Sequence, residues 1–159
     1  NYNYPGQVVI GGEVKAVDFA GELAKKEGAL RVIPLRVSAP FHTSMLRPAS
    51  ERLGKELAQI RMGDIKIPVI SNVIADYIAK REQIKELLQK QVMYPLLWTK
   101  CMLKMIQDGV DTFIEIGPGK VLSGFLKKID KNLIICNVED ISSLNNTLQI
   151  LESCKCQQI

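Results

Sequence analysis

Apolar and polar positions alternate regularly along this chain of 159 residues. Short apolar runs, typical of buried strands, are separated by longer segments in which apolar residues recur every three or four positions, as on one face of a helix. The runs predict strands at 7–12, 31–39, 66–73, 112–116 and 133–138; the spaced pattern predicts helices at 13–28, 43–60, 81–92, 99–109, 120–129 and 143–153. This alternation predicts an α/β fold with a largely parallel sheet.

Two loops of this pattern are candidate sites for function. In open α/β sheets, ligands bind in the loops at the carboxyl ends of the strands. The sequence SAPFHTS follows the expected strand at 31–39, and IGPGKVL follows the expected strand at 112–116. Pro34 lies inside the first of these strands, which indicates an edge position or a bend.

Composition narrows the class of protein. The chain is 47% hydrophobic and 24% charged, which is ordinary for a globular protein. It has no apolar run near the ~18 residues of a membrane span, and its first residues lack the basic and apolar regions of a signal peptide. We therefore expect a cytoplasmic protein that does not bind a membrane. The net charge of +4 comes without long basic blocks, so the sequence does not indicate nucleic acid as a partner.

The four cysteines do not indicate a metal site. They occur at Cys101, Cys136, Cys154 and Cys156, with no C-x-x-C pair and no zinc-type spacing. Cys101 and Cys136 lie in apolar runs and are expected to be buried, reduced thiols. We expect no metal and no cofactor.

His42 is the only histidine in the chain. It lies in a polar loop just before an expected helix, and a histidine there suits general acid–base catalysis if a nucleophile is near. No Gly-x-Ser-x-Gly nucleophile elbow occurs in the sequence, and Ser123 lies within an expected helix. From the residues alone, a structural histidine and a catalytic base both remain open.

The segment Gly117–Lys120, with the sequence GPGK, invites comparison with phosphate-binding loops. It lacks the earlier glycine of a P-loop, and Val121 replaces the Ser or Thr that should follow Lys120. The dinucleotide fingerprint fails as well, because Leu122 replaces its third glycine. A tight structural turn and a weak anion site at a helix N-terminus remain the two alternatives.

Taken together, four segments resemble the bacterial malonyl-CoA:acyl carrier protein transacylases. These segments are NYNYPGQVVIGGEVKAV, PLRVSAPFHTSMLRPA, IPVISNV and FIEIGPGKVLSGFLKKI, and they occur in the family's order over at least residues 1–131. The resemblance implies malonyl transfer from coenzyme A to the phosphopantetheine thiol of acyl carrier protein, in fatty acid biosynthesis. It also implies an acyl-serine intermediate on a G-H-S-x-G elbow.

The resemblance also implies roles for individual residues. His42 matches the histidine that activates the serine, and Gln91 matches the residue whose backbone carbonyl orients it. A carbonyl fixes the tautomer without placing a full charge beside the ring. Asn1 and Asn3 match asparagines that line the pocket, and Arg31 matches a basic position facing the coenzyme A phosphates.

The family's serine, its oxyanion-hole glutamine and its malonate-binding arginine have no counterpart in these residues. We therefore expect the C-terminal half of such an enzyme. Residues 1–36 would end a small ferredoxin-like subdomain, and residues 37–159 would form the C-terminal part of an α/β-hydrolase-like domain. Expected partners are malonyl-CoA, acyl carrier protein and the missing N-terminal half. The alternatives are a non-catalytic fragment or split subunit, and a polyketide-type acyltransferase for another acyl group.

Overall fold

The computed structural model describes residues 1–37 and 39–156 of the chain. It forms two compact units, one of residues 1–3 and 7–101, the other of residues 4–6 and 102 onward. The boundary falls inside helix α4 (Trp98–Gln107). In the described residues, no helix is both long enough and apolar enough to cross a membrane.

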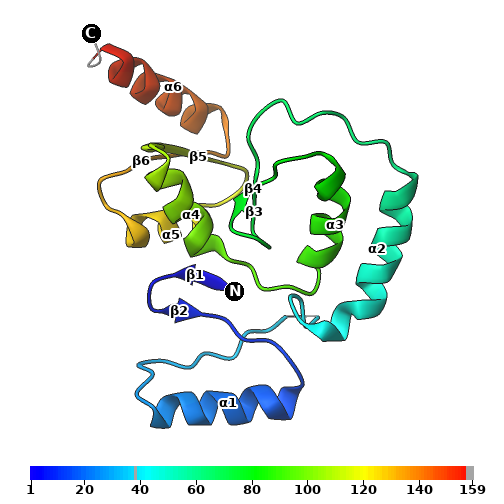
Figure 1. The fold of residues 1–159 in the computed structure, drawn as a ribbon. Helices are drawn as coiled ribbons and strands as arrows, with labels where there is room; N and C mark the ends of the chain where they lie inside the picture. The colour runs from blue at the N-terminus through cyan, green and yellow to red at the C-terminus, as the bar shows by residue number, and fades with distance from the viewer. Residues whose placement is uncertain (38, 157–159) are drawn as a thin grey trace. The chain divides into compact units, whose positions relative to one another are not determined.

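The first unit is mainly helical. It contains α1 (Val14–Lys26), the short 3-10 helix η1 (Ser44–Leu46), α2 (Arg47–Gln59) and α3 (Glu82–Gln91). Two short strand pairs accompany them. In one, β1 (Tyr2–Tyr4) pairs with β2 (Gln7–Val8); in the other, β3 (Ile70–Ser71) pairs antiparallel with β4 (Asp76–Tyr77). Helices α2 and α3 lie side by side (Figure 1).

The second unit is built on a parallel strand pair. Strand β5 (Thr112–Ile116) pairs with β6 (Ile134–Val138), in a register that runs from Thr112 opposite Ile134 to Ile116 opposite Val138. Helix α5 (Val121–Ile129) connects the two strands, and α6 (Ile141–Cys156) follows β6 (Figure 1). Parallel strands need such a crossover connection, so β5, α5 and β6 form one βαβ unit, as the alternating pattern predicted.

Local sequence explains where several helices begin and end. Pro48 lies in the first turn of α2, where its missing N–H leaves no helical hydrogen bond unmade. Gly109, which follows α4, has a φ of 91°. Glycine adopts this left-handed conformation without a steric penalty, so it ends the helix as the pattern predicted.

The strand predicted at 31–39 is absent from the described residues. Residues 31–37 have no strand pairing, and Leu30, Ile33 and Val37 are exposed. Pro34 has no N–H to donate to a neighbouring strand. The prediction from the apolar run was therefore wrong, because residues 31–37 pair with no neighbouring strand among the described residues. Ser38 of the predicted strand lies outside the described residues.

The largely parallel sheet that the pattern predicted is also not found among the described residues. They form three separate two-stranded sheets, and β3 with β4 is antiparallel. The predicted strand at 66–73 is only two residues long, and β1 and β4 were not predicted. The mixed α/β class is nevertheless correct. Alternation along the chain reports the kind of element, whereas it does not report which strands find partners.

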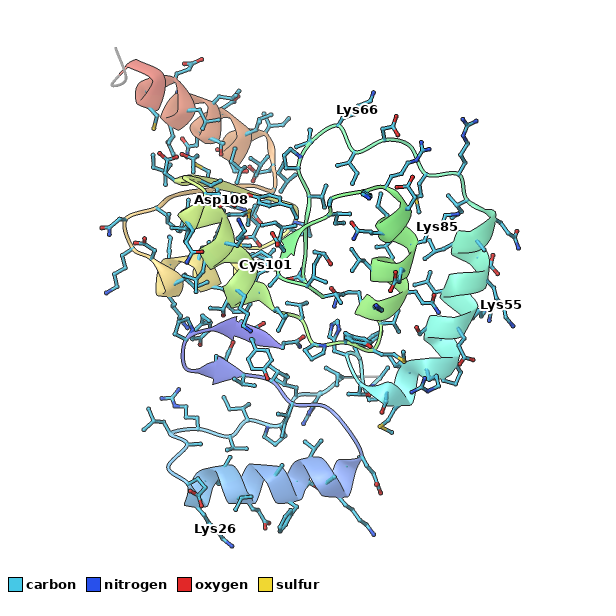
Figure 2. The ribbon with its side chains drawn as sticks, viewed as in Figure 1. Lys26, Lys55, Lys66, Lys85, Cys101 and Asp108 are labelled. Carbon is cyan, nitrogen blue, oxygen red and sulfur yellow. The ribbon has the colours of Figure 1, made fainter. Side chains whose placement is uncertain are left out.

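The buried hydrophobic side chains of the described residues are few and mostly medium-sized. They are Leu57, Leu87, Cys101, Met102, Leu126 and Cys136. Cys101 lies within the first unit at 1% exposure, whereas Lys26 and Lys55 point outward from their helices (Figure 2). Many large apolar side chains remain exposed, including Phe19 on α1, Ile116 at the end of β5 and Ile141 at the start of α6. Exposed apolar surface on this scale is typical of a face that another chain or segment covers.

This exposure predicts that the isolated 159-residue chain binds the dye anilinonaphthalene sulfonate and associates with itself as its concentration rises. The physical reason is that burying apolar surface is favourable by about 25 cal/mol per Å². Dye fluorescence and sedimentation velocity across a concentration series measure the two effects. A monomer that stays dye-negative at every concentration would contradict the expectation.

Candidate functional site

His42 lies in the loop before α2, and the loop is held by its own hydrogen bonds. The hydroxyl of Thr43 donates to the carbonyl O of Pro40 at 2.7 Å and accepts from the backbone N–H of Met45 at 3.3 Å. His42 itself has a φ of 62°, in the left-handed region that non-glycine residues rarely adopt. Such backbone strain persists only where surrounding contacts fix it.

Those contacts come from the C-terminal end of α3. The backbone N–H of His42 donates to the carbonyl O of Val92 at 3.0 Å. The ring atom Nδ1 lies 2.9 Å from the carbonyl O of Gln91 and 3.1 Å from that of Tyr94. A carbonyl oxygen only accepts, so these contacts require a proton on Nδ1. In the neutral ring, the lone pair is then on Nε2, the atom available to act as a base.

Close packing of α2 against α3 supports this arrangement. Ser50 on α2 is 1% exposed, and its hydroxyl donates to the carbonyl O of Gln89 on α3 at 2.9 Å. A Cβ atom at Gly54, one turn further along α2, would lie only 2.7 Å from the side chain of Gln89. The Ser50 hydrogen bond therefore ties α2, which follows the His42 loop, to the helix that carries Gln91. The contact at Gly54 is with the flexible end of the Gln89 side chain.

The structure places Asn1 and Asn3 on a segment that is tied to the chain just after Tyr94. Strand β1 is held there because the N–H of Tyr2 donates to the carbonyl O of Leu96 at 2.9 Å, and the hydroxyl of Thr99 donates to the carbonyl O of Tyr2 at 3.1 Å. The side chain of Asn3 donates to Gln7 at 3.0 Å. The Oδ1 atom of Asn1 is buried and has no hydrogen-bond partner among the described residues.

Arg31 is not brought to this cluster by any hydrogen bond or ion pair of the described residues. It is an exposed residue of the irregular segment that was predicted to be a strand. The pocket and phosphate-binding roles implied for Asn1, Asn3 and Arg31 stay predictions.

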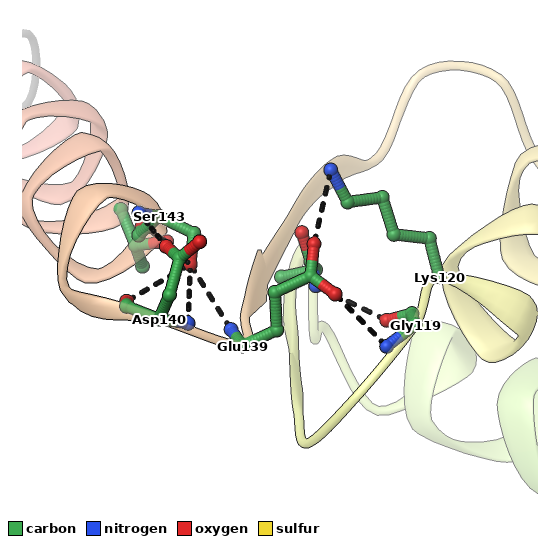
Figure 3. Close-up of polar contacts among 7 residues, drawn as sticks. Gly119, Lys120, Glu139, Asp140 and Ser143 are labelled. Carbon is green, nitrogen blue, oxygen red and sulfur yellow. Dashed lines mark hydrogen bonds and ion pairs between the residues drawn. The ribbon is translucent and has the colours of Figure 1, made fainter.

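The GPGK segment forms a turn that is held by hydrogen bonds within this chain, one of them from a backbone amide to a carboxylate. Glu139 accepts from the N–H of Gly119 at 3.0 Å and lies 3.5 Å from the ammonium group of Lys120 (Figure 3). Gly117 and Gly119 have φ values of 137° and 87°, conformations that favour glycine. Of the two alternatives, the structural turn is the one that these contacts support.

Glu115 on β5 binds the N-terminus of α5. Its carboxylate accepts from the N–H groups of Leu122 at 3.1 Å and Ser123 at 2.7 Å. Partial burial acts to raise the pKa of the Glu115 carboxyl, but hydrogen bonds from Ser123 and Leu122 together lower that pKa below its usual value. A carboxylate at this position satisfies amides that the helix leaves unpaired. It is a contact that the sequence did not reveal.

Asp140 caps the next helix in a similar way. Its carboxylate accepts from the N–H of Ser143 at 2.7 Å, and the Ser143 hydroxyl accepts from the N–H of Asp140 at 3.0 Å (Figure 3). This reciprocal pair resembles a capping box, and hydrogen bonds from Ser143 lower the pKa of Asp140. The loops after β5 and β6 are thus occupied by contacts that begin helices.

Cysteine and metal chemistry find no support in the described residues. Cys101 is buried beside the carbonyl O of Ser71 and the side-chain oxygen of Asn72, and burial raises the pKa of its thiol to about 11. A thiol of that pKa is protonated at neutral pH and is a poor nucleophile. Cys136 is also buried, as predicted. No group of three or more His, Cys, Asp or Glu residues that could hold a metal occurs in the described part of the chain.

Fold and site together define an α/β protein with a histidine whose Nδ1 is held by main-chain carbonyls. No family model matches the chain. It is 46% identical to the malonyl CoA-acyl carrier protein transacylase of Bacillus subtilis over 152 residues, which cover 96% of the chain and 48% of that protein. The Escherichia coli K12 transacylase is 38% identical over 150 residues, covering 94% of the chain and 48% of the relative.

Solved structures give the same result. The crystal structure of MCAT from Streptococcus pneumoniae has a TM-score of 0.90 at 49% identity, covering 94% of this chain and 48% of that one. The Clostridium perfringens transacylase has a TM-score of 0.88 at 48% identity, with coverages of 92% and 46%. The chain is a homologue of the malonyl CoA-acyl carrier protein transacylases, and it spans about half the length of the relatives it matches.

Glu115→Gln is expected to speed hydrogen exchange at the amides of Leu122 and Ser123 by about fivefold, because a capping side chain contributes ~1 kcal/mol. Since the folded-state pKa of Glu115 is lowered, its contribution is present above the unfolded pKa and is lost as pH falls through the folded pKa. Exchange rates, normalised to the intrinsic rate at each pH, measure both effects. The amides of α6, which Asp140 and Ser143 cap, serve as the control. Equal protection in the variant would contradict the assignment.

Proposed function

We propose that this chain carries the general base of a malonyl-CoA:acyl carrier protein transacylase. The observation that carries the proposal is the contact between Nδ1 of His42 and the carbonyl O of Gln91, on a backbone homologous to that family over nearly the whole chain. His42 and Gln91 are also the two positions that the family resemblance assigns to the base and to its orienting carbonyl.

In the proposed reaction, Nε2 of His42 takes the proton from a serine hydroxyl as the oxygen attacks the thioester carbonyl of malonyl-CoA. The thioester C–S bond breaks, the coenzyme A thiolate receives the proton from the imidazolium, and malonyl stays on the serine as an ester. The phosphopantetheine thiol of acyl carrier protein then gives its proton to Nε2 and attacks the ester carbonyl. The ester C–O bond breaks, malonyl passes to the thiol as a thioester, and the serine oxygen takes the proton back from the imidazolium. The sequence has no elbow serine in its 159 residues, so the nucleophile is proposed to lie outside them.

The finer assignments rest on the same resemblance. Residues 1–36 are proposed to end a ferredoxin-like subdomain, and residues 37–159 to belong to an α/β-hydrolase-like domain. Asn1 and Asn3 are proposed to line the pocket, and Arg31 to face the phosphates of coenzyme A. One solved relative, a malonyl-transacylase in complex with a type II PKS acyl-carrier protein, has a TM-score of 0.83 at 37% identity. It supports a carrier protein as the acceptor.

A second candidate is a chain that binds but does not react, such as one part of a split enzyme. The exposed apolar side chains favour a covering partner in either case. The two candidates differ only in whether His42 performs chemistry once a nucleophile is supplied.

The isolated chain is expected to form no covalent adduct with malonyl-CoA, because no serine in it has an elbow context. Mixed with the N-terminal half of the Bacillus subtilis relative, it is expected to restore one malonyl adduct, located on that half, and transfer to acyl carrier protein. Intact mass after acid trapping measures the adduct. The N-terminal half alone is the control. A stoichiometric adduct on the isolated chain would contradict the proposal that the nucleophile lies outside it. A lack of transfer by a mixture that forms a stable complex would contradict the proposed function.

In the same mixture, His42→Ala is expected to lower transfer by ~10²–10⁴-fold, the usual contribution of general acid–base catalysis. Gln91→Ala should leave transfer close to that of the unchanged protein, because alanine keeps the carbonyl that His42 contacts. The Nε2 atom of Gln91 also has no hydrogen-bond partner among the described residues to lose. Steady-state rates, with folding checked by circular dichroism, decide the matter. Equal losses in two folded variants would refute the proposed pair.

A further inference from the structure

Three carbonyl groups at and just beyond the C-terminal end of α3 contact a single residue. His42 donates its backbone N–H to Val92, and its ring contacts Gln91 and Tyr94 through Nδ1. Any α-helix leaves its last carbonyls without helical partners, and those groups need donors from elsewhere. Here one histidine in the left-handed conformation supplies them from a segment about 50 residues earlier in the chain.

The hydrogen bonds along α3 show why the Gln91 carbonyl is free to accept. The N–H of Tyr94 donates to the carbonyl O of Lys90 at 2.9 Å, which is a helical bond across four residues. The next bond of that series would run from residue 95 to the carbonyl O of Gln91. Residue 95 is proline, which has no N–H. The last turn already tightens at Met93, whose N–H also donates to the carbonyl O of Lys90 at 3.0 Å. Pro95 then removes the N–H that would continue the series to the Gln91 carbonyl.

Pro95 acts on the second acceptor as well. A proline disfavours the helical conformation of the residue before it, so Tyr94 is pushed out of the helix. Its carbonyl then lies 3.1 Å from Nδ1 of His42 instead of pointing along the helix axis. One proline thus affects both carbonyls that contact the ring.

We propose that Pro95 is a positioning residue for His42: by withholding the N–H that would occupy the Gln91 carbonyl, it keeps that carbonyl and the Tyr94 carbonyl available to Nδ1. The base tautomer, with the lone pair on Nε2, is set by this arrangement. The inference rests on the proposed function for its catalytic meaning, but the tautomer can be measured without any turnover.

The test uses the fact that His42 is the only histidine in the chain. The chain is labelled with ¹⁵N-histidine and mixed with the unlabelled N-terminal half of the Bacillus subtilis relative, so that the imidazole signals come from His42 alone. In the unchanged chain, the ¹⁵N shifts should show a protonated Nδ1. In Pro95→Ala, the restored N–H competes for the Gln91 carbonyl, and a substantial fraction of the Nε2-protonated tautomer should appear.

Pro68→Ala is the matched control, because Pro68 is also exposed in the first unit but has no contact with His42 among the described residues. It should keep the original tautomer. Pro95→Gly is the second variant, for use if Pro95→Ala fails to fold. It restores the N–H without favouring a helical backbone, and it should show the same change of tautomer. An unchanged chain with its proton on Nε2, or a folded Pro95 variant that keeps the original tautomer, would overturn the proposal.

Kinetics provide a separate measurement. Pro95→Ala should lower kcat by about 10- to 100-fold, as misplacement of a catalytic group does, with the KM for malonyl-CoA changed less than about twofold. A 10- to 100-fold change in KM with an unchanged kcat would count against positioning. If Pro95→Ala shifts the tautomer but the mixture with the unchanged chain shows no malonyl transfer, the proposed function fails while the positioning of His42 by Pro95 stands. If transfer occurs and neither kcat nor the tautomer responds to the substitution, the positioning fails alone.

Discussion

The contact between the His42 loop and the end of α3 is the constraint on which the site depends. A left-handed backbone at a non-glycine residue is unfavourable by itself, and here it is compensated by one backbone and two ring contacts to three carbonyl groups. The same contacts determine which ring nitrogen carries the proton. Helix termination, backbone strain and the position of the ring proton are therefore consequences of a single local arrangement.

The packing of α2 on α3 connects the His42 loop to both of these helices in the first unit. Ser50 donates to the carbonyl O of Gln89, two residues before Gln91, and the side chain of Gln89 lies against Gly54. The residue that follows His42, Thr43, fixes the loop from the other side through Pro40. The ring is thus held between a capped loop and a helix end, with little reliance on long side chains, whose many rotamers would have to be frozen.

Local sequence predicted the elements far better than their pairing. The βαβ unit of β5, α5 and β6 agrees with the pattern because each strand has an adjacent apolar helix to pack against. The strand at 31–39 failed because an apolar run carries no information about a hydrogen-bonding partner, and Pro34 removes one donor. The contact from His42 to Gln91 could be anticipated only through the family resemblance, since 49 residues separate the two positions. The carbonyls of Val92 and Tyr94 were missed, although Pro95 four residues after Gln91 was a readable sign that a carbonyl there lacks a helical partner.

The described contacts of the His42 backbone and ring all lie within residues 42–94, inside one compact unit. On the proposed function, the base is therefore oriented before any nucleophile is present, and only the serine has to be brought to it. Orienting the base in advance lowers the free-energy cost of completing the site, because a group that is already oriented loses less conformational entropy at that point. It also separates two properties that mutations in a complete enzyme tend to mix. On these proposals, residues around Pro95 set the tautomer of His42, whereas the exposed apolar side chains form the surface that a partner would cover.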